Sequence, residues 1–142
     1  LRANIAAIEA SFTSDEARVY RQGEDVVVSL TGINFPSGRS TIDGTSAALM
    51  RKVQQALARF PDASIVVEGH TDANGSDSAN LILSQDRADA VKQYLVSQFG
   101  ANAEKISSIG YGEARPVATN ETPAGRARNR RIDLVIHVQG SG

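Results

Sequence analysis

One stretch of the sequence constrains the fold more than any other: an apolar run, a short polar loop and a helix-forming segment in succession. Residues 65–72 read Ile-Val-Val-Glu-Gly-His-Thr-Asp, which predicts a buried strand that ends at Gly69 and is followed by a loop. The spacing of apolar residues after position 80 predicts a helix. A strand, a loop and a helix in this order indicate a domain in which helices pack on a sheet.

Polar side chains lie along one side of this predicted helix. Asn80, Ser84, Arg87 and Val91 are 4, 3 and 4 residues apart, so in a helix they form one stripe. Asp72 lies just beyond the end of the strand, where ligand-binding groups are often placed. A carboxylate that faces a guanidinium suits a small ligand with both an ammonium and a carboxylate, because arginine binds a carboxylate through two parallel hydrogen bonds.

Both charged residues also have simpler interpretations. Asp72 begins an Asp-Ala-Asn-Gly run, which forms turns without any further function. Arg87 could be a surface arginine that pairs with Asp86 or Asp89. The positions of Asn80 and Ser84, on the same stripe and nearer to the loop of Asp72, favour the ligand-binding interpretation.

The remaining elements follow from apolar periodicity and from the positions of glycine and proline. In chain order we expect a helix at 1–12, strands at 17–21 and 26–31, a helix at 42–60, a strand at 65–69, a helix at 80–99, a strand at 106–110, a loop at 111–125 and a strand at 131–138. The two strands that flank the long helix should run parallel. We therefore predict an α+β fold, an α/β sandwich with a βαβαβ core, in which a mixed sheet of four to five strands carries helices on one face.

Composition excludes several classes of protein. The 142 residues are enough for one domain, and the net charge of −1 gives no basic field to attract nucleic acid. The absence of cysteine excludes disulfides and thiolate metal sites within the chain. No apolar run approaches the ~20 residues that a membrane-spanning helix needs. The first eight residues do not read as a signal peptide, and we expect the chain to be part of a longer protein.

Metal and catalytic sites have little support. A metal cluster of Glu68, His70, Asp72 and Asp77 is conceivable, but His-x-Asp is a generic pair and no second histidine lies nearby, so we predict no metal site. The sequence has no Gly-x-Ser-x-Gly motif, and its only other histidine, His137, falls in a predicted strand. We predict that the chain is not an enzyme and uses no cofactor.

Four arginines lie within residues 125–131. Such a cluster can bind a polyanion, but no aromatic residues alternate with these arginines, so we expect no nucleic acid partner. One alternative is a short helical turn that leads into the last strand and braces the loop around Asn120. Another places Arg130 at the edge of a site formed by Asp72 and Arg87.

Three motifs match one known family in order and separation. They are Gly69-His-Thr-Asp72, then Asn80-x-x-Leu-Ser-x-x-Arg-Ala-x-x-Val91, and finally Gly110-Tyr-Gly-Glu113 with Gly125-Arg-x-x-Asn-Arg-Arg131. Through them the chain resembles the OmpA-like peptidoglycan-binding domain over residues 26–138. Residues 1–25 would then be an added helix and strand leading from an upstream membrane anchor, and residues 139–142 a flexible tail. The loop at 33–38 keeps the family's Phe35 but lacks its acidic residue.

The resemblance implies non-covalent binding of peptidoglycan through the diaminopimelate of its stem peptide. Carried over by motif position, Asp72 binds the ammonium and Arg87 the carboxylate, while Thr71, Asn80 and Leu83 line the pocket and Arg130 lies at its rim. The domain would tether an outer-membrane protein or lipoprotein to the cell wall in the periplasm of a Gram-negative cell, through a membrane segment outside this chain. The alternative is an OmpA-like domain that binds other envelope proteins, through the apolar stripe of its N-terminal helix.

Overall fold

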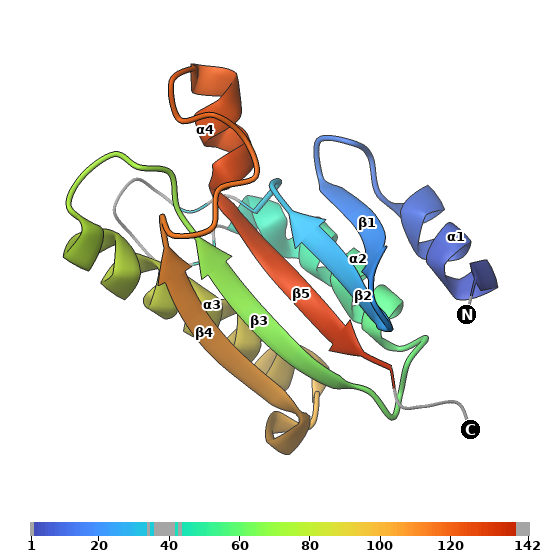
Figure 1. The fold of residues 1–142 in the computed structure, drawn as a ribbon. Coiled ribbons are helices and arrows are strands. Elements are labelled where there is room, and N and C mark those ends of the chain that lie inside the picture. Colours follow the sequence, from blue (N-terminus) through green and yellow to red (C-terminus); the bar gives the residue numbers. More distant parts are fainter. Residues whose placement is uncertain (1, 34, 36–41, 43, 139–142) are drawn as a thin grey trace.

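A five-stranded mixed sheet forms the centre of the computed structural model, which describes residues 2–33, 35, 42 and 44–138 (Figure 1). The strands are β1 (Ala17–Gln22), β2 (Asp25–Leu30), β3 (Ser64–His70), β4 (Ile106–Gly112) and β5 (Arg131–His137), and their order across the sheet is β1-β2-β5-β3-β4. β3 and β4 run parallel, whereas the other neighbouring pairs are antiparallel. The predicted mixed sheet and the parallel pair around the long helix are confirmed.

Three helices cover one face of this sheet, as predicted (Figure 1). They are α1 (Arg2–Ser11), α2 (Ala47–Leu57) and α3 (Asp77–Phe99). The fourth helix, α4 (Pro123–Asn129), lies beyond the end of the sheet, just before β5. Two short 3-10 helices, η1 (Gly44–Ser46) and η2 (Ala103–Lys105), precede α2 and β4. No helix in the described ranges is long and apolar enough to cross a membrane.

The core lies between the sheet and these three helices. Alternate residues of the central strands point into it, among them Val26, Val28, Leu30, Ile132, Leu134 and Ile136. Met50 of α2 and Val91 of α3 pack against them, and Ile8 of α1 is fully buried in the same cluster. Burying one such side chain contributes roughly 1.5–3 kcal/mol. The described part of the N-terminal segment, residues 2–25, therefore packs on the core of the domain through residues such as Ile8 and Ala17, while its role as a link to an upstream anchor stays a prediction.

Two glycines let α3 lie unusually close to the sheet. A Cβ at Gly69 of β3 would come within 2.8 Å of the carbonyl carbon of Ser84, and one at Gly110 of β4 within 2.6 Å of the Cα of Gln85. Both distances are far shorter than van der Waals contact, so any side chain at these positions would push the helix away. The close approach places the first turns of α3 beside the end of β3, where Asp72 follows.

Some boundaries differ from the predicted ones. α3 begins three residues earlier than expected, because Ser76 caps it by accepting a hydrogen bond from the backbone N–H of Ala79 at 3.2 Å. α2 begins at Ala47, after η1, and β4 extends two residues further than predicted. The predicted tail at 139–142, and the loop at 33–38 apart from Ile33 and Phe35, lie outside the described residues.

The prediction of an unbroken loop over residues 111–125 was wrong at its end. α4 starts at Pro123, with Thr122 accepting a hydrogen bond from the N–H of Gly125 at 3.0 Å. The alternative of a helical turn that braces the loop around Asn120 is confirmed by Asn129, which is fully buried. Its side chain accepts from the N–H groups of residues 117 and 118 and donates to Oδ1 of Asn120 at 2.8 Å.

Candidate functional site

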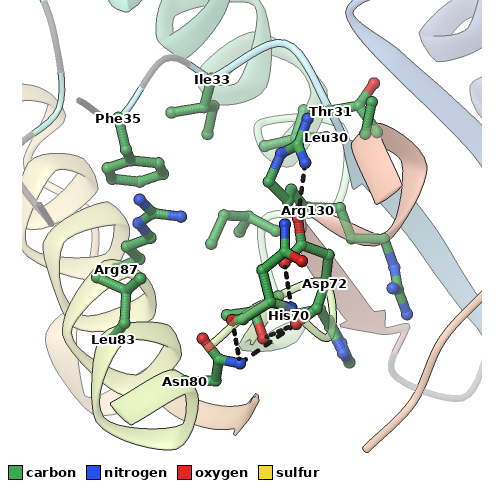
Figure 2. Close-up of a pocket in the computed structure, with 15 residues that line it drawn as sticks. Leu30, Thr31, Ile33, Phe35, His70, Asp72, Asn80, Leu83, Arg87 and Arg130 are labelled. Atoms are coloured by element: carbon green, nitrogen blue, oxygen red, sulfur yellow. Dashed lines mark hydrogen bonds and ion pairs between the residues drawn. The ribbon is translucent and has the colours of Figure 1, made fainter. Parts of the chain in front are cut away.

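A cavity of about 660 Å³ opens at the carboxyl end of β3, between the first turns of α3 and the last turn of α4 (Figure 2). All six residues expected at a site line it: Thr71, Asp72, Asn80, Leu83, Arg87 and Arg130. Phe35, which the loop at 33–38 shares with the family, lines it too. The volume lies within the range of roughly 300–1,000 Å³ that is typical of sites for small molecules.

Asp72 is held in place from several sides. It is 7% exposed, and the preceding residue is fixed by a hydrogen bond from the N–H of Thr71 to the carbonyl oxygen of Gly112 at 2.9 Å. Oδ1 of Asp72 accepts from the N–H of Asn74 at 3.0 Å, so the side chain stabilises a turn, as one interpretation of the sequence expected. Oδ2 accepts from Nη1 of Arg130 at 2.7 Å. The carboxylate is thus both a turn-former and a charged wall of the cavity.

Arg87 lies on the opposite wall, half-buried on α3. Its guanidinium carbon is 4.9 Å from the centre of the Phe35 ring, a cation–π distance (Figure 2). Burial lowers the pKa of Arg87 most, the positive charge of Arg130 lowers it further, and the negative charge of Asp72 raises it. The two arginines and Asp72 therefore act on one another electrostatically across the same cavity.

Asn80 lines the cavity, but its amide nitrogen is already used to hold the loop that carries Asp72. Nδ2 donates to the carbonyl oxygen of Asn74 at 2.9 Å and to Oε1 of Glu113 at 3.3 Å. Ser84, expected on the polar stripe between Asp72 and Arg87, does not line the cavity. Its hydroxyl instead accepts from the N–H of Gly112 at 2.8 Å and so ties α3 to β4.

Acidic groups gather at the Asn80 end of the site. The hydrogen bond between Glu113 and Asp77 raises the pKa of Glu113, and the bond from Asn80 opposes this rise. The negative charge of Asp72 raises the pKa of Glu113 as well. Asp77 and Glu113 are not among the residues that line the cavity; within the lining, Asp72 supplies a negative charge on one side and Arg87 a positive charge on the other, which suits a zwitterion.

A second polar cluster lies on the face of the sheet opposite the helices. Nε2 of His70 is 3.2 Å from Oε1 of Glu68 and 3.7 Å from Oδ2 of Asp133, and Asp133 also accepts from Nε of Arg131 at 3.1 Å. Glu68 and His70 were among the metal-ligand candidates in the sequence, whereas Asp72 and Asp77 do not belong to this cluster. Arg131 already supplies a positive charge to it. The alternation of charged Arg131 and Asp133 with apolar residues in β5 is the sequence signal that points to such a cluster.

Several further residues line the cavity that sequence reasoning did not identify. They come from the end of β2 and the residues after it, the end of β3 and the loop that follows, α4, and the start of β5: Leu30, Thr31, Ile33, His70, Asn74, Ala127, Arg131 and Ile132. The apolar members give the cavity a wall that methylene groups could contact.

The chain has clear relatives. A family model described as the OmpA family matches residues 34–130. Outer membrane porin F of Pseudomonas aeruginosa is 37% identical over 107 residues, which are 75% of this chain and 31% of that protein. The peptidoglycan-binding protein ArfA of Mycobacterium tuberculosis is 34% identical over 116 residues, which are 80% of this chain and 35% of that protein. The chain thus spans about a third of the length of either relative.

The fold has a close match among solved structures. The cell wall anchor of the T6SS from P. aeruginosa superposes with a TM-score of 0.83 and 27% identity, covering 95% of this chain and 97% of that chain. That match includes nearly all of the present chain, and the family model covers the first two motifs in full and the third as far as Arg130. The chain belongs to the OmpA family.

Proposed function

We propose that this domain binds peptidoglycan without cleaving it, through the diaminopimelate of the stem peptide. The observation that carries the proposal is the placement of Asp72 and Arg87 on opposite walls of one cavity. The side-chain end of diaminopimelate carries an ammonium and a carboxylate on the same carbon. Membership of the OmpA family and the similarity to ArfA, whose name describes it as peptidoglycan-binding, support peptidoglycan as the polymer that is bound.

In this proposal the ligand ammonium binds Asp72 and the ligand carboxylate binds Arg87. Each charge-assisted hydrogen bond contributes roughly 1.5–3 kcal/mol where the partners are partly desolvated, as both residues are here. Leu83 and Ile33 would contact the methylene chain of the ligand, and Thr71 and Asn80 would shape the end of the pocket near Asp72. Arg130 stands at the rim.

The setting of this binding is proposed as well. A domain that holds the stem peptide would tether an outer-membrane protein or lipoprotein to the cell wall from the periplasm, with the membrane attachment lying outside this chain. The alternative, binding of other envelope proteins through the stripe of α1, has less support. Ile8 is fully buried, and Ile5 and Phe12 pack against the same core, so most of that stripe is already covered.

Sedimentation with purified diaminopimelate-type peptidoglycan tests the proposal. Asp72→Asn keeps the size of the side chain and removes its charge, and Arg87→Gln removes the charge with a shorter polar side chain. Each should abolish or greatly reduce co-sedimentation. Asp86→Asn and Arg128→Gln are the matched controls, because both residues are exposed and neither lines the cavity. Normal co-sedimentation of both pocket variants, with melting temperatures like the wild type, would show that the site lies elsewhere.

A further inference from the structure

The carboxylate proposed to receive the ligand ammonium already has a cationic partner within the protein. Nη1 of Arg130 lies 2.7 Å from Oδ2 of Asp72. The Asp72 side chain is 10% exposed and its other oxygen is fixed by Asn74, whereas the Arg130 side chain is 48% exposed. The carboxylate is therefore held in place, while the guanidinium borders on water and can change partner at little cost.

An incoming ammonium must displace Arg130 from Asp72 or share the carboxylate with it. A ligand that brings an ammonium alone exchanges one ion pair for another. Such an exchange gains little, since a partly exposed pair of this kind contributes only ~0–1 kcal/mol relative to its separated ions. Arg130 would also be left next to the positive charge of Arg87, whose pKa it already lowers.

A ligand with an adjacent carboxylate changes this balance. Figure 2 shows Arg87 on one side of the open part of the pocket and Arg130, with Asp72, on the other. A carboxylate placed between them accepts hydrogen bonds from Arg87 and gives Arg130 a new anionic partner when Arg130 leaves Asp72. Asp72, Arg87 and Arg130 together carry one excess positive charge. A ligand with an ammonium alone would raise this excess to two charges, whereas a ligand that also brings a carboxylate leaves it at one.

We propose that Arg130 is a specificity-determining residue, which restricts the pocket to ammonium ligands that also carry a carboxylate. In the free protein Arg130 forms an ion pair with Asp72, and when the ligand binds it moves to the carboxylate of the ligand. This inference rests on the proposed function and deepens it. It separates diaminopimelate from lysine, whose side chain ends in an ammonium alone, and so separates two chemical types of stem peptide.

The test compares two tripeptides that differ at this one residue, L-Ala-γ-D-Glu-meso-diaminopimelate and L-Ala-γ-D-Glu-L-Lys, by calorimetric titration. The wild type should bind the first and bind the second much more weakly. Arg130→Gln removes the internal competitor, so its affinity for the lysine peptide should rise while its affinity for the diaminopimelate peptide stays level or falls. The ratio of the two affinities should drop about tenfold or more. Arg128→Gln is the control two residues before Arg130, at an exposed position of α4 outside the cavity, and Arg130→Lys, which keeps the charge, should restore much of the ratio.

The possible results distinguish failure of the role of Arg130 from failure of the proposed function. An Arg130→Gln variant with an unchanged ratio, or with lysine-peptide binding that stays as weak as in the wild type, overturns the exchange while leaving the proposed function in place. A wild type that binds neither tripeptide overturns the proposed function, and the inference with it. Melting temperatures of the variants show whether they are folded.

Discussion

Replacing Gly69 by alanine should damage both the fold and the pocket, because this position is where α3 touches β3. The added Cβ would meet backbone atoms, since the Ser84 carbonyl carbon lies 2.8 Å from its ideal position. That carbon must retreat by about 0.6 Å to reach the 3.4 Å at which ordinary contact begins, and the carbonyl oxygen must retreat further. No rotation of a side chain can relieve the clash, so the helix itself has to move.

Overpacking of this kind typically costs about 1–3 kcal/mol and occasionally more. For a domain of this size such a loss should lower the melting temperature by roughly 3–10 °C. Because Arg87 follows Ser84 by less than one turn, the shift should also carry its guanidinium away from Asp72. We therefore expect weaker binding of peptidoglycan by the protein that remains folded.

Urea unfolding followed by circular dichroism measures the loss of unfolding free energy. Peptidoglycan co-sedimentation is measured without urea and at temperatures at which the variant is still folded. Gly44→Ala is the matched control, because nothing lies within 4 Å of a Cβ at that position, and it should be neutral or slightly stabilising. A Gly69→Ala protein with the wild-type midpoint and slope would refute the reasoning. It would mean that α3 can shift at no cost and that its close approach does not set the pocket.

Two further substitutions test other parts of the structure. Asn129→Ala should destabilise the protein by about 2–3 kcal/mol in urea unfolding, because it leaves two backbone N–H groups of the loop without their acceptor; an unchanged midpoint would contradict this. Lys52 lies 2.7 Å from Glu16 and its hydrogen bond is the largest cause of the lowered pKa of Glu16. A carboxyl with a lowered folded-state pKa stabilises the protein above its unfolded pKa and loses that effect as pH falls through its folded pKa. Lys52→Met should therefore reduce stability at neutral pH by at most about 1 kcal/mol, with no difference left at strongly acidic pH.

The sequence predicted best those features that depend on neighbours along the chain. Asn80 and Arg87 lie on the first turns of one helix and Asp72 on the loop just before it, so helical spacing together with a short connection predicts that they lie near one another. α4 was only half recognised, although Thr122 and Pro123 form a normal helix start. The roles of Ser84 and the Asn80 amide could not be predicted, since they depend on Gly112, the last residue of β4, and on Glu113 just after it, 28 and 33 positions away.

The contact between Arg130 and Asp72 depends on the order of the strands in the sheet, and no local sequence pattern predicts that order. β5 inserts between β2 and β3 and pairs antiparallel with β3, with Arg131 opposite His70. This register brings the residue just before β5 next to the residues just after β3, so Arg130 meets Asp72 across 58 positions of sequence. A slip of one residue would turn every side chain of β5 to the other face and remove Ile132 and Leu134 from the core. The same apolar residues that bury β5 therefore also hold Arg130 against Asp72, and core and pocket depend on one register.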